Sequence, residues 1–297
     1  MARRWDVVVI GAGPAGLAAA RVVAAGGLSC AVIERMGPGG ETMNLGTIHH
    51  APAGAAGMSG GDFAAALLDE AMGAGAELVF AEATGVTGNG PWTVATDDEA
   101  HDARAVIVAT GLAKGTLGLA NEADYEGRGL SHCAACDGPL YAGKNVVVAG
   151  PDGWAIQEAV DLASVAAGVT LVVDGPVPAG ALDGLDNLTA LAGRIVGLAG
   201  DDGVERVAIV DAGGARTLEA TGVFVYTDRR PATAVAPGSA ARDGDGALVI
   251  DGVGSTSEIG LFAAGDARAG AAERIVEALA DGENAGRAAV AYLHAMA

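Results

Sequence analysis

Residues 6–16 read DVVVIGAGPAG, and residues 145–155 read NVVVAGPDGWA. Each stretch is a β-branched run, followed by a glycine-containing turn and then by an Ala-rich sequence that favours a helix. This order is typical of the first strand, turn and helix of a βαβ unit. A second apolar run follows each one, LSCAVIE ending at Glu34 and VTLVVD ending at Asp174. The chain is therefore predicted to contain two βαβ-based units of related architecture.

The composition narrows the class of protein. The 297 residues suffice for about two domains, and 17 basic against 37 acidic side chains give a net charge of −20. Such an acidic surface repels nucleic-acid phosphates and anionic lipid. Arg3 and Arg4 precede an apolar run, as in a secretion signal, but Asp6, several glycines and Arg21 interrupt it. We expect a cytoplasmic protein with no membrane span and no nucleic-acid partner.

The order of the motifs predicts the domain organisation. A buried strand is expected at 104–110, and the late segment GLFAAGD at 260–266 is expected to contain another before a final Ala-rich helix. Two loop-rich stretches separate the first βαβ unit from the second and the second from this late segment. The predicted fold is α/β, with two Rossmann-like dinucleotide-binding domains, the second inserted into the first. The first domain is predicted to comprise residues 1–115 and 243–297, and the second residues 116–242.

The first turn has the glycine pattern of a dinucleotide site. Gly11, Gly13 and Gly16 complete GxGxxG between a strand and a helix. Gly11 permits the tight turn, Gly13 lets the backbone approach a pyrophosphate, and Gly16 allows close helix–strand packing. The helix N-terminus supplies unpaired N–H groups to the phosphates. Glu34, at the end of the next strand, can bind ribose hydroxyls. The alternative is a close-packed turn that binds nothing.

A pair of cysteines lies before the second βαβ unit, in SHCAACDGPLY. Cys133 and Cys136 could form a redox disulfide, half of a zinc site, or a coincidental spacing. Zinc needs four ligands, and the remaining cysteine, Cys30, lies in a predicted buried strand. A redox pair is therefore favoured, and no metal is expected. Asp137 could move a proton to or from a sulfur or cap a helix, and His132 could hold a thiolate or be an ordinary surface histidine.

These motifs together resemble the low-molecular-weight thioredoxin reductase family. The matching segments include GAGPAG, PGG at 38–40, ATG at 109–111, GRGLSHCAACDG at 127–138 and GLFAAGD. The resemblance covers nearly the whole chain. It implies a homodimer, with FAD in the first domain and a Cys133–Cys136 disulfide that exchanges electrons with it while Asp137 serves as acid–base partner. The residues implied to bind FAD are Gly11, Gly13, Pro14, Ala15, Gly16, Glu34, Arg35, Gly39, Gly40, Thr110, Gly111 and Asp266.

The second nucleotide unit departs from this pattern. The internal repeat places Gly150, Asp152 and Ala155 where the first unit has its three glycines. Asp152 puts a negative charge where a pyrophosphate must touch backbone. NADPH-preferring members of the family carry a His-Arg-Arg segment after the second strand, whereas this chain has Val173, Asp174 and a glycine. Each lost charge-assisted phosphate contact costs about 1.5–3 kcal/mol, so NADPH is not expected to be used efficiently.

Three functions remain open from the sequence. The first is an FAD-dependent, thioredoxin reductase-like dithiol–disulfide oxidoreductase without NADPH supply. Its partner would be a thioredoxin-like protein or a small disulfide, and its donor ferredoxin or another flavin. The second is an O₂-dependent dithiol oxidase that forms a disulfide in a small molecule or a protein. The third is a non-catalytic, flavin-binding redox sensor.

Overall fold

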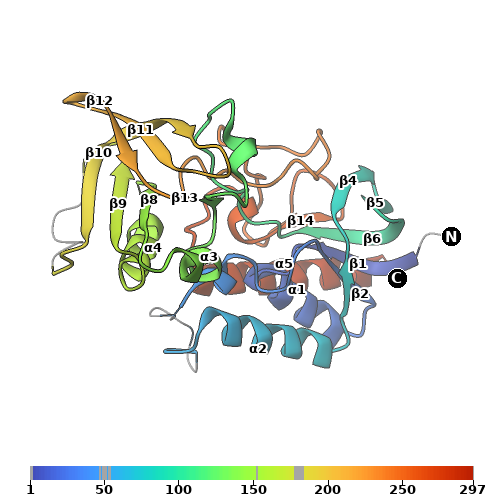
Figure 1. Cartoon of the computed structure of the whole chain (residues 1–297). Coiled ribbons are helices and arrows are strands. Elements are labelled where there is room, and N and C mark those ends of the chain that lie inside the picture. The colour runs from blue at the N-terminus through green and yellow to red at the C-terminus, as the bar shows by residue number, and fades with distance from the viewer. Residues whose placement is uncertain are drawn as a thin grey trace. The chain divides into compact units, whose positions relative to one another are not determined.

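The computed structural model describes residues 3–46, 48, 52, 55–151, 153–176 and 184–296, so Asp152 lies outside the described residues. The chain divides into two compact units (Figure 1). Unit 1 comprises Met1–Ala113 and Arg230–Ala297, and unit 2 comprises Lys114–Arg229. No helix in the described parts of the chain combines the length and the apolar character that a membrane crossing requires.

Unit 1 is built on a sheet in the order β3-β2-β1-β6-β5-β4, with β14 pairing to β6. The central strand β1 pairs in parallel with both of its neighbours, and its Val-rich run is buried on both faces, as expected of a parallel strand inside an α/β layer. The strands are β1 (Arg3–Ile10), β2 (Cys30–Glu34), β3 (Glu77–Phe80), β4 (Ala83–Gly88), β5 (Trp92–Thr96), β6 (Ala100–Val108) and β14 (Leu261–Ala263). The helices are α1 (Pro14–Ala25), η1 (Gly40–Asn44), α2 (Gly60–Gly73), η4 (Gly265–Ala267) and α5 (Ile275–Ala295).

Unit 2 repeats the central part of this plan. Its sheet has the order β12-β11-β10-β9-β8-β13-β7, in which β8 pairs in parallel with both β9 and β13. The strands are β7 (Leu130–Ser131), β8 (Asn145–Ala149), β9 (Gly168–Val173), β10 (Leu188–Ala199), β11 (Arg206–Asp211), β12 (Gly214–Glu219) and β13 (Gly222–Val225). The helices are η2 (Glu122–Tyr125), α3 (Ala134–Asp137), η3 (Gly138–Tyr141) and α4 (Gly153–Ala163). The predicted pair of βαβ-based α/β domains is confirmed.

The second crossing between the units falls at 229/230, whereas the order of the motifs predicts it at 242/243. Residues 230–242 form irregular structure that bonds to unit 1. The Ala232 N–H donates to the Gly111 carbonyl at 2.9 Å, and the Val86 N–H donates to the Val235 carbonyl at 2.8 Å. Ala236 is also buried in the core of unit 1. This segment has no helical or strand periodicity that would have assigned it to either unit.

Helices α1 and α5 of unit 1 approach closely through glycines. A Cβ on Gly282 would overlap the carbonyl of Ala15, and a Cβ on Gly286 would lie 2.9 Å from the carbonyl oxygen of Ala19. The two helices therefore meet backbone to backbone. Because α1 begins at the GxGxxG turn, this contact also fixes the start of α1.

We predict that Gly282→Ala destabilises the protein by about 1–3 kcal/mol, because the added methyl group forces the two helices apart. The apparent Tm of the flavin-loaded protein, followed by circular dichroism, should fall by about 2–10 °C. Gly73→Ala is the matched control, because Gly73 also lies in a helix but has no atom near an added Cβ. A Gly282→Ala protein with the same apparent Tm as the Gly73→Ala control would contradict this packing.

Candidate functional site

The GxGxxG turn of unit 1 is held by backbone contacts that only glycine permits. Gly11 follows β1 with φ +100°, and a Cβ there would overlap the carbonyl of Ala109 at the end of β6. A Cβ on Gly16 would overlap the carbonyl of Gly11. The Cα of Thr110 also lies beside Gly11, at 3.2 Å from the position of a Cβ. The ATG segment and the glycine turn therefore meet at the carboxyl ends of their strands.

Two further predicted loops reach the same place. Gly40 lies against Gly13, since a Cβ on Gly40 would be 3.1 Å from the Gly13 Cα. Gly265, which precedes Asp266 in the late AAGD segment, would place a Cβ 2.9 Å from the Cβ of Ala15. Four segments far apart in the sequence thus surround the N-terminus of α1. These segments contain all but two of the residues predicted to bind the dinucleotide. The two exceptions are Glu34, the last residue of β2, and Arg35, which follows it.

The N-terminus of α1 suits an anionic ligand. Its first turn contains no acidic residue, and its N-cap Gly13 makes no side-chain cap hydrogen bond. The nearest atom to a Cβ built on Gly13, apart from its neighbours in the chain, is the Gly40 Cα at 4.0 Å. Backbone N–H groups at a helix start attract phosphate through hydrogen bonding and partial positive charge. These residues therefore fit the pyrophosphate of a dinucleotide.

Glu34 is fixed at the end of β2 by two backbone donors. The Ala12 N–H donates to Oε2 and the Met36 N–H donates to Oε1, each at 2.9 Å. An ionised carboxylate has about four acceptor positions, so Glu34 can still accept hydrogen bonds from ribose hydroxyls.

The Arg35 side chain pairs with Glu82 at 3.6 Å on an exposed surface. The Thr110 hydroxyl donates to the Ala232 carbonyl at 2.8 Å.

The cysteine pair of unit 2 forms a disulfide. Cys133 and Cys136 are bonded, with their Cα atoms 5.3 Å apart, across the start of α3. The Cys136 N–H donates to the Cys133 Sγ at 3.1 Å. Cys136 is exposed and Cys133 is partly buried. Cys30 is a buried thiol in β2 of unit 1, where burial raises its pKa to about 12. The pairing of Cys133 with Cys136 in a disulfide is therefore confirmed.

Asp137 is held beside the disulfide by a serine that the sequence analysis did not single out. The Ser131 hydroxyl donates to Asp137 Oδ2 at 2.7 Å, and the Cys133 N–H donates to the same hydroxyl oxygen at 3.2 Å. Asp137 is the N-cap residue of η3, but its side chain makes no capping hydrogen bond to that helix. Burial and the charge of Asp137 raise the pKa of Tyr141. The Asp137 carboxylate is therefore oriented by Ser131 rather than by helix capping.

His132 is engaged with an acidic residue of the preceding loop. Its Nε2 hydrogen-bonds Glu126 Oε1 at 2.8 Å, and its side chain is only 12 % exposed. It is therefore not an ordinary solvent-exposed histidine.

A buried acid and a tyrosine contact the backbone of the cysteine segment. Glu158 of α4 is 1 % exposed, and its Oε2 accepts from the Tyr226 hydroxyl at 2.9 Å and from the Ala134 N–H at 3.2 Å. Ala134 is the residue that follows Cys133. Neither Glu158 nor Tyr226 belongs to a motif, and only the pairing of β13 beside β8 brings Tyr226 near α4.

The second glycine turn keeps its backbone packing but carries a different first helical turn. A Cβ on Gly150 would lie 2.5 Å from the Cβ of the fully buried Ala155, so alanine is accommodated at the third position, as predicted. Trp154 lies in the first turn of α4, and the Arg229 guanidinium sits 5.7 Å from its ring centroid. Asp174, directly after β9, is exposed.

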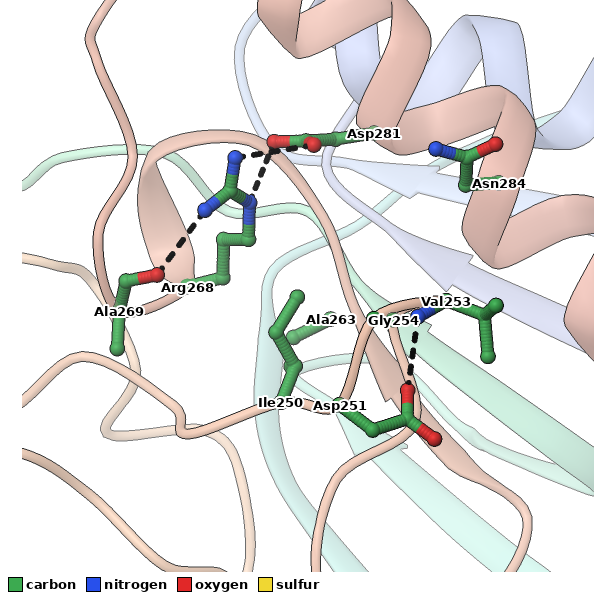
Figure 2. Close-up of a pocket in the computed structure, with 10 residues that line it drawn as sticks. Ile250, Asp251, Val253, Gly254, Ala263, Arg268, Ala269, Asp281 and Asn284 are labelled. Atoms are coloured by element: carbon green, nitrogen blue, oxygen red, sulfur yellow. Dashed lines mark hydrogen bonds and ion pairs between the residues drawn. The ribbon is translucent and has the colours of Figure 1, made fainter.

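A separate cavity of about 430 Å³ lies in unit 1 between the 250–254 loop and α5 (Figure 2). Arg268 on its wall donates to both carboxylate oxygens of Asp281, at 2.6 and 3.0 Å, and to the Ala269 carbonyl at 3.0 Å. Asp251 accepts from the Val253 N–H at 3.0 Å. None of the predicted site residues lines this cavity.

Comparison with known proteins agrees with this geometry. Residues 5–282 match the family described as pyridine nucleotide-disulphide oxidoreductase. The thioredoxin reductase of Treponema pallidum is 31% identical over 306 residues, covering 97% of each chain.

Solved structures give the same result. The crystal structure of Lactococcus lactis thioredoxin reductase matches with a TM-score of 0.91 and 25% identity, over 98% of this chain and 99% of that one. A ferredoxin-flavin thioredoxin reductase from Clostridium acetobutylicum matches with a TM-score of 0.57 and 27% identity, over 99% and 100%. The chain therefore belongs to the pyridine nucleotide-disulphide oxidoreductase family, as a flavin-dependent disulfide oxidoreductase of the low-molecular-weight thioredoxin reductase type.

Proposed function

We propose that this enzyme passes two electrons through the Cys133–Cys136 pair to the disulfide of a thioredoxin-like protein or a small molecule, and that NADPH is not its donor. The observation that carries the second part is the first turn of α4, which has Trp154 where the first nucleotide turn has Ala15. We also propose that the enzyme acts in the cytoplasm as a homodimer, as the family resemblance implies.

The residues around the start of α1 are proposed to hold FAD. The turn containing Gly11, Gly13 and Gly16 would receive the pyrophosphate, and Glu34 the adenosine ribose. Asp266, after the Gly265 that contacts Ala15, would lie beside the ribityl chain. When bound, FAD supplies the two-electron chemistry that links a donor to the disulfide.

The exchange with substrate uses the chain's own sulfurs. In the reduced pair, one thiolate attacks the substrate disulfide and forms a mixed disulfide, expelling one substrate thiolate. The second cysteine then attacks the mixed disulfide and re-forms Cys133–Cys136. The substrate gains two electrons and two protons and leaves as a dithiol. Asp137, whose Oδ2 accepts from the Ser131 hydroxyl at 2.7 Å, would accept or return a proton at sulfur.

Two features of unit 2 argue against NADPH. Trp154 lies in the first turn of α4, where backbone N–H groups would otherwise meet a pyrophosphate. An exposed Asp174 follows β9, where a 2′-phosphate requires positive charge. The likeness to a ferredoxin-flavin thioredoxin reductase supports ferredoxin or a flavin as the donor.

We predict that Gly13→Asp abolishes FAD binding while leaving the protein folded. The substitution gives unit 1 the residue that the repeat places at position 152. The nearest atom to the new Cβ, apart from its neighbours in the chain, is the Gly40 Cα at 4.0 Å. The purified variant should be colourless with a native circular dichroism spectrum. Gly61→Asp, in the first turn of α2, is the control and should stay yellow. A Gly13→Asp protein with one FAD per chain would refute the assignment.

We predict that Asp137→Asn slows disulfide reduction by about 10²–10⁴-fold, because the proton carrier at sulfur is removed. The enzyme is reduced with stoichiometric dithionite without oxygen and mixed with oxidised thioredoxin, and flavin reoxidation is followed by stopped flow. The exposed Asp124→Asn serves as a control of equal charge. A rate within threefold of the wild type would exclude Asp137 from proton transfer.

We predict that micromolar NADPH or NADH leaves the flavin absorbance unchanged under anaerobic conditions, whereas dithionite bleaches it. Dithiothreitol should also bleach it, because it opens the Cys133–Cys136 disulfide. Cys136→Ser should lose the response to dithiothreitol and keep the response to dithionite. Rapid bleaching by micromolar NADPH would overturn the donor proposal and leave the disulfide assignment untouched.

A further inference from the structure

Glu158 is a buried carboxyl group that the disulfide exchange described above does not use. It lies on α4, which packs against α3, the helix of the cysteine pair. Its Oε2 accepts from the Ala134 N–H at 3.2 Å, and Ala134 is bonded directly to Cys133. The side chain thus contacts the backbone between the two sulfur-bearing residues.

The hydrogen bonds around Glu158 suit a negative charge. The Tyr226 hydroxyl donates to Oε2 at 2.9 Å, and the Ala134 N–H also approaches the Tyr226 oxygen at 3.0 Å. Burial and the charge of Glu158 raise the pKa of Tyr226, so that its hydroxyl keeps its proton and remains a donor. The Arg229 guanidinium is near enough to lower that pKa in turn, and it supplies a counter-charge. Two donors to one carboxylate oxygen favour the ionised form.

We infer that Glu158 is a positioning residue whose buried negative charge, held against the Ala134 N–H, disfavours thiolate in the reduced Cys133–Cys136 pair and makes that pair a stronger reductant. A like charge close to a thiol opposes ionisation, and a dithiol whose thiolate is less stabilised gives up its electrons more readily. The low local dielectric strengthens the effect. The inference rests on the exchange role of the cysteine pair and is independent of the electron donor.

The test is the equilibrium between the cysteine pair and dithiothreitol in the flavin-loaded enzyme, without oxygen. Two electrons and two protons pass from dithiothreitol to the disulfide, giving two protein thiols and cyclic oxidised dithiothreitol. Acid quenching, denaturation and a mass-tagged alkylating reagent then count thiols. With three cysteines in the chain, the oxidised form takes one tag, on Cys30, and the reduced form takes three.

Glu158→Gln removes the charge and keeps an oxygen that can accept from Tyr226 and Ala134. We expect the equilibrium constant to shift toward the dithiol by about tenfold or more, which corresponds to about 30 mV for a two-electron couple. Asp161→Asn makes the same change of charge on the same helix at an exposed position, and it should stay within twofold of the wild type. A purely structural Glu158 would leave the constant of Glu158→Gln unchanged, and that result, or a shift of opposite sign, would overturn the inference.

Tyr226→Phe provides a second variant should Glu158→Gln fail to fold. Loss of the hydroxyl removes a donor from the carboxylate and so raises the proton affinity of Glu158. We expect a smaller shift in the same direction as for Glu158→Gln. No shift, or a shift toward the disulfide, would count against the inference. Because thiols are counted directly, failure of this proposal is distinguishable from failure of the donor proposal.

Discussion

The nucleotide site of unit 1 depends on one constraint, that any side chain at Gly11 or Gly16 would overlap backbone carbonyls. With glycine at both positions, the turn after β1 packs against the end of β6. The first N–H groups of α1 then have no side chain over them. The glycine contacts between α1 and α5 hold the helix from its other side. Unit 2 uses the same close packing, between Gly150 and Ala155, but places Trp154 at the start of its helix. One backbone plan therefore serves two different chemical environments.

Two kinds of carboxyl group lie near the cysteine pair. Ser131 orients Asp137 on the segment that carries the disulfide, close in sequence to the exposed Cys136. Glu158 is fully buried and accepts a hydrogen bond from the Ala134 N–H of the same segment. The first group is partly buried, and the second is enclosed with a tyrosine. This difference in burial underlies the two roles proposed for them, proton transfer for Asp137 and an electrostatic effect for Glu158.

Most of what the sequence predicted rests on local features. The β-branched runs and glycine spacings identified β1, β8 and their turns, because strand periodicity and turn chemistry depend on residues within about ten positions of one another. The cysteine spacing identified the disulfide for the same reason. Residues 230–242 could not be assigned, because they have no periodicity and join unit 1 through scattered hydrogen bonds and the burial of Ala236. Glu158 and Tyr226 were missed because they are 68 residues apart and meet only through the sheet of unit 2.

The central claim is that the two nucleotide turns share a backbone but only the first still accepts a dinucleotide. Isothermal titration calorimetry of the flavin-loaded enzyme with NADP⁺ tests it most directly, since binding is measured without electron transfer. The account predicts one retained FAD per chain and no saturable heat up to about 1 mM NADP⁺, an affinity weaker than about −4 kcal/mol. A dissociation constant in the micromolar range would contradict it.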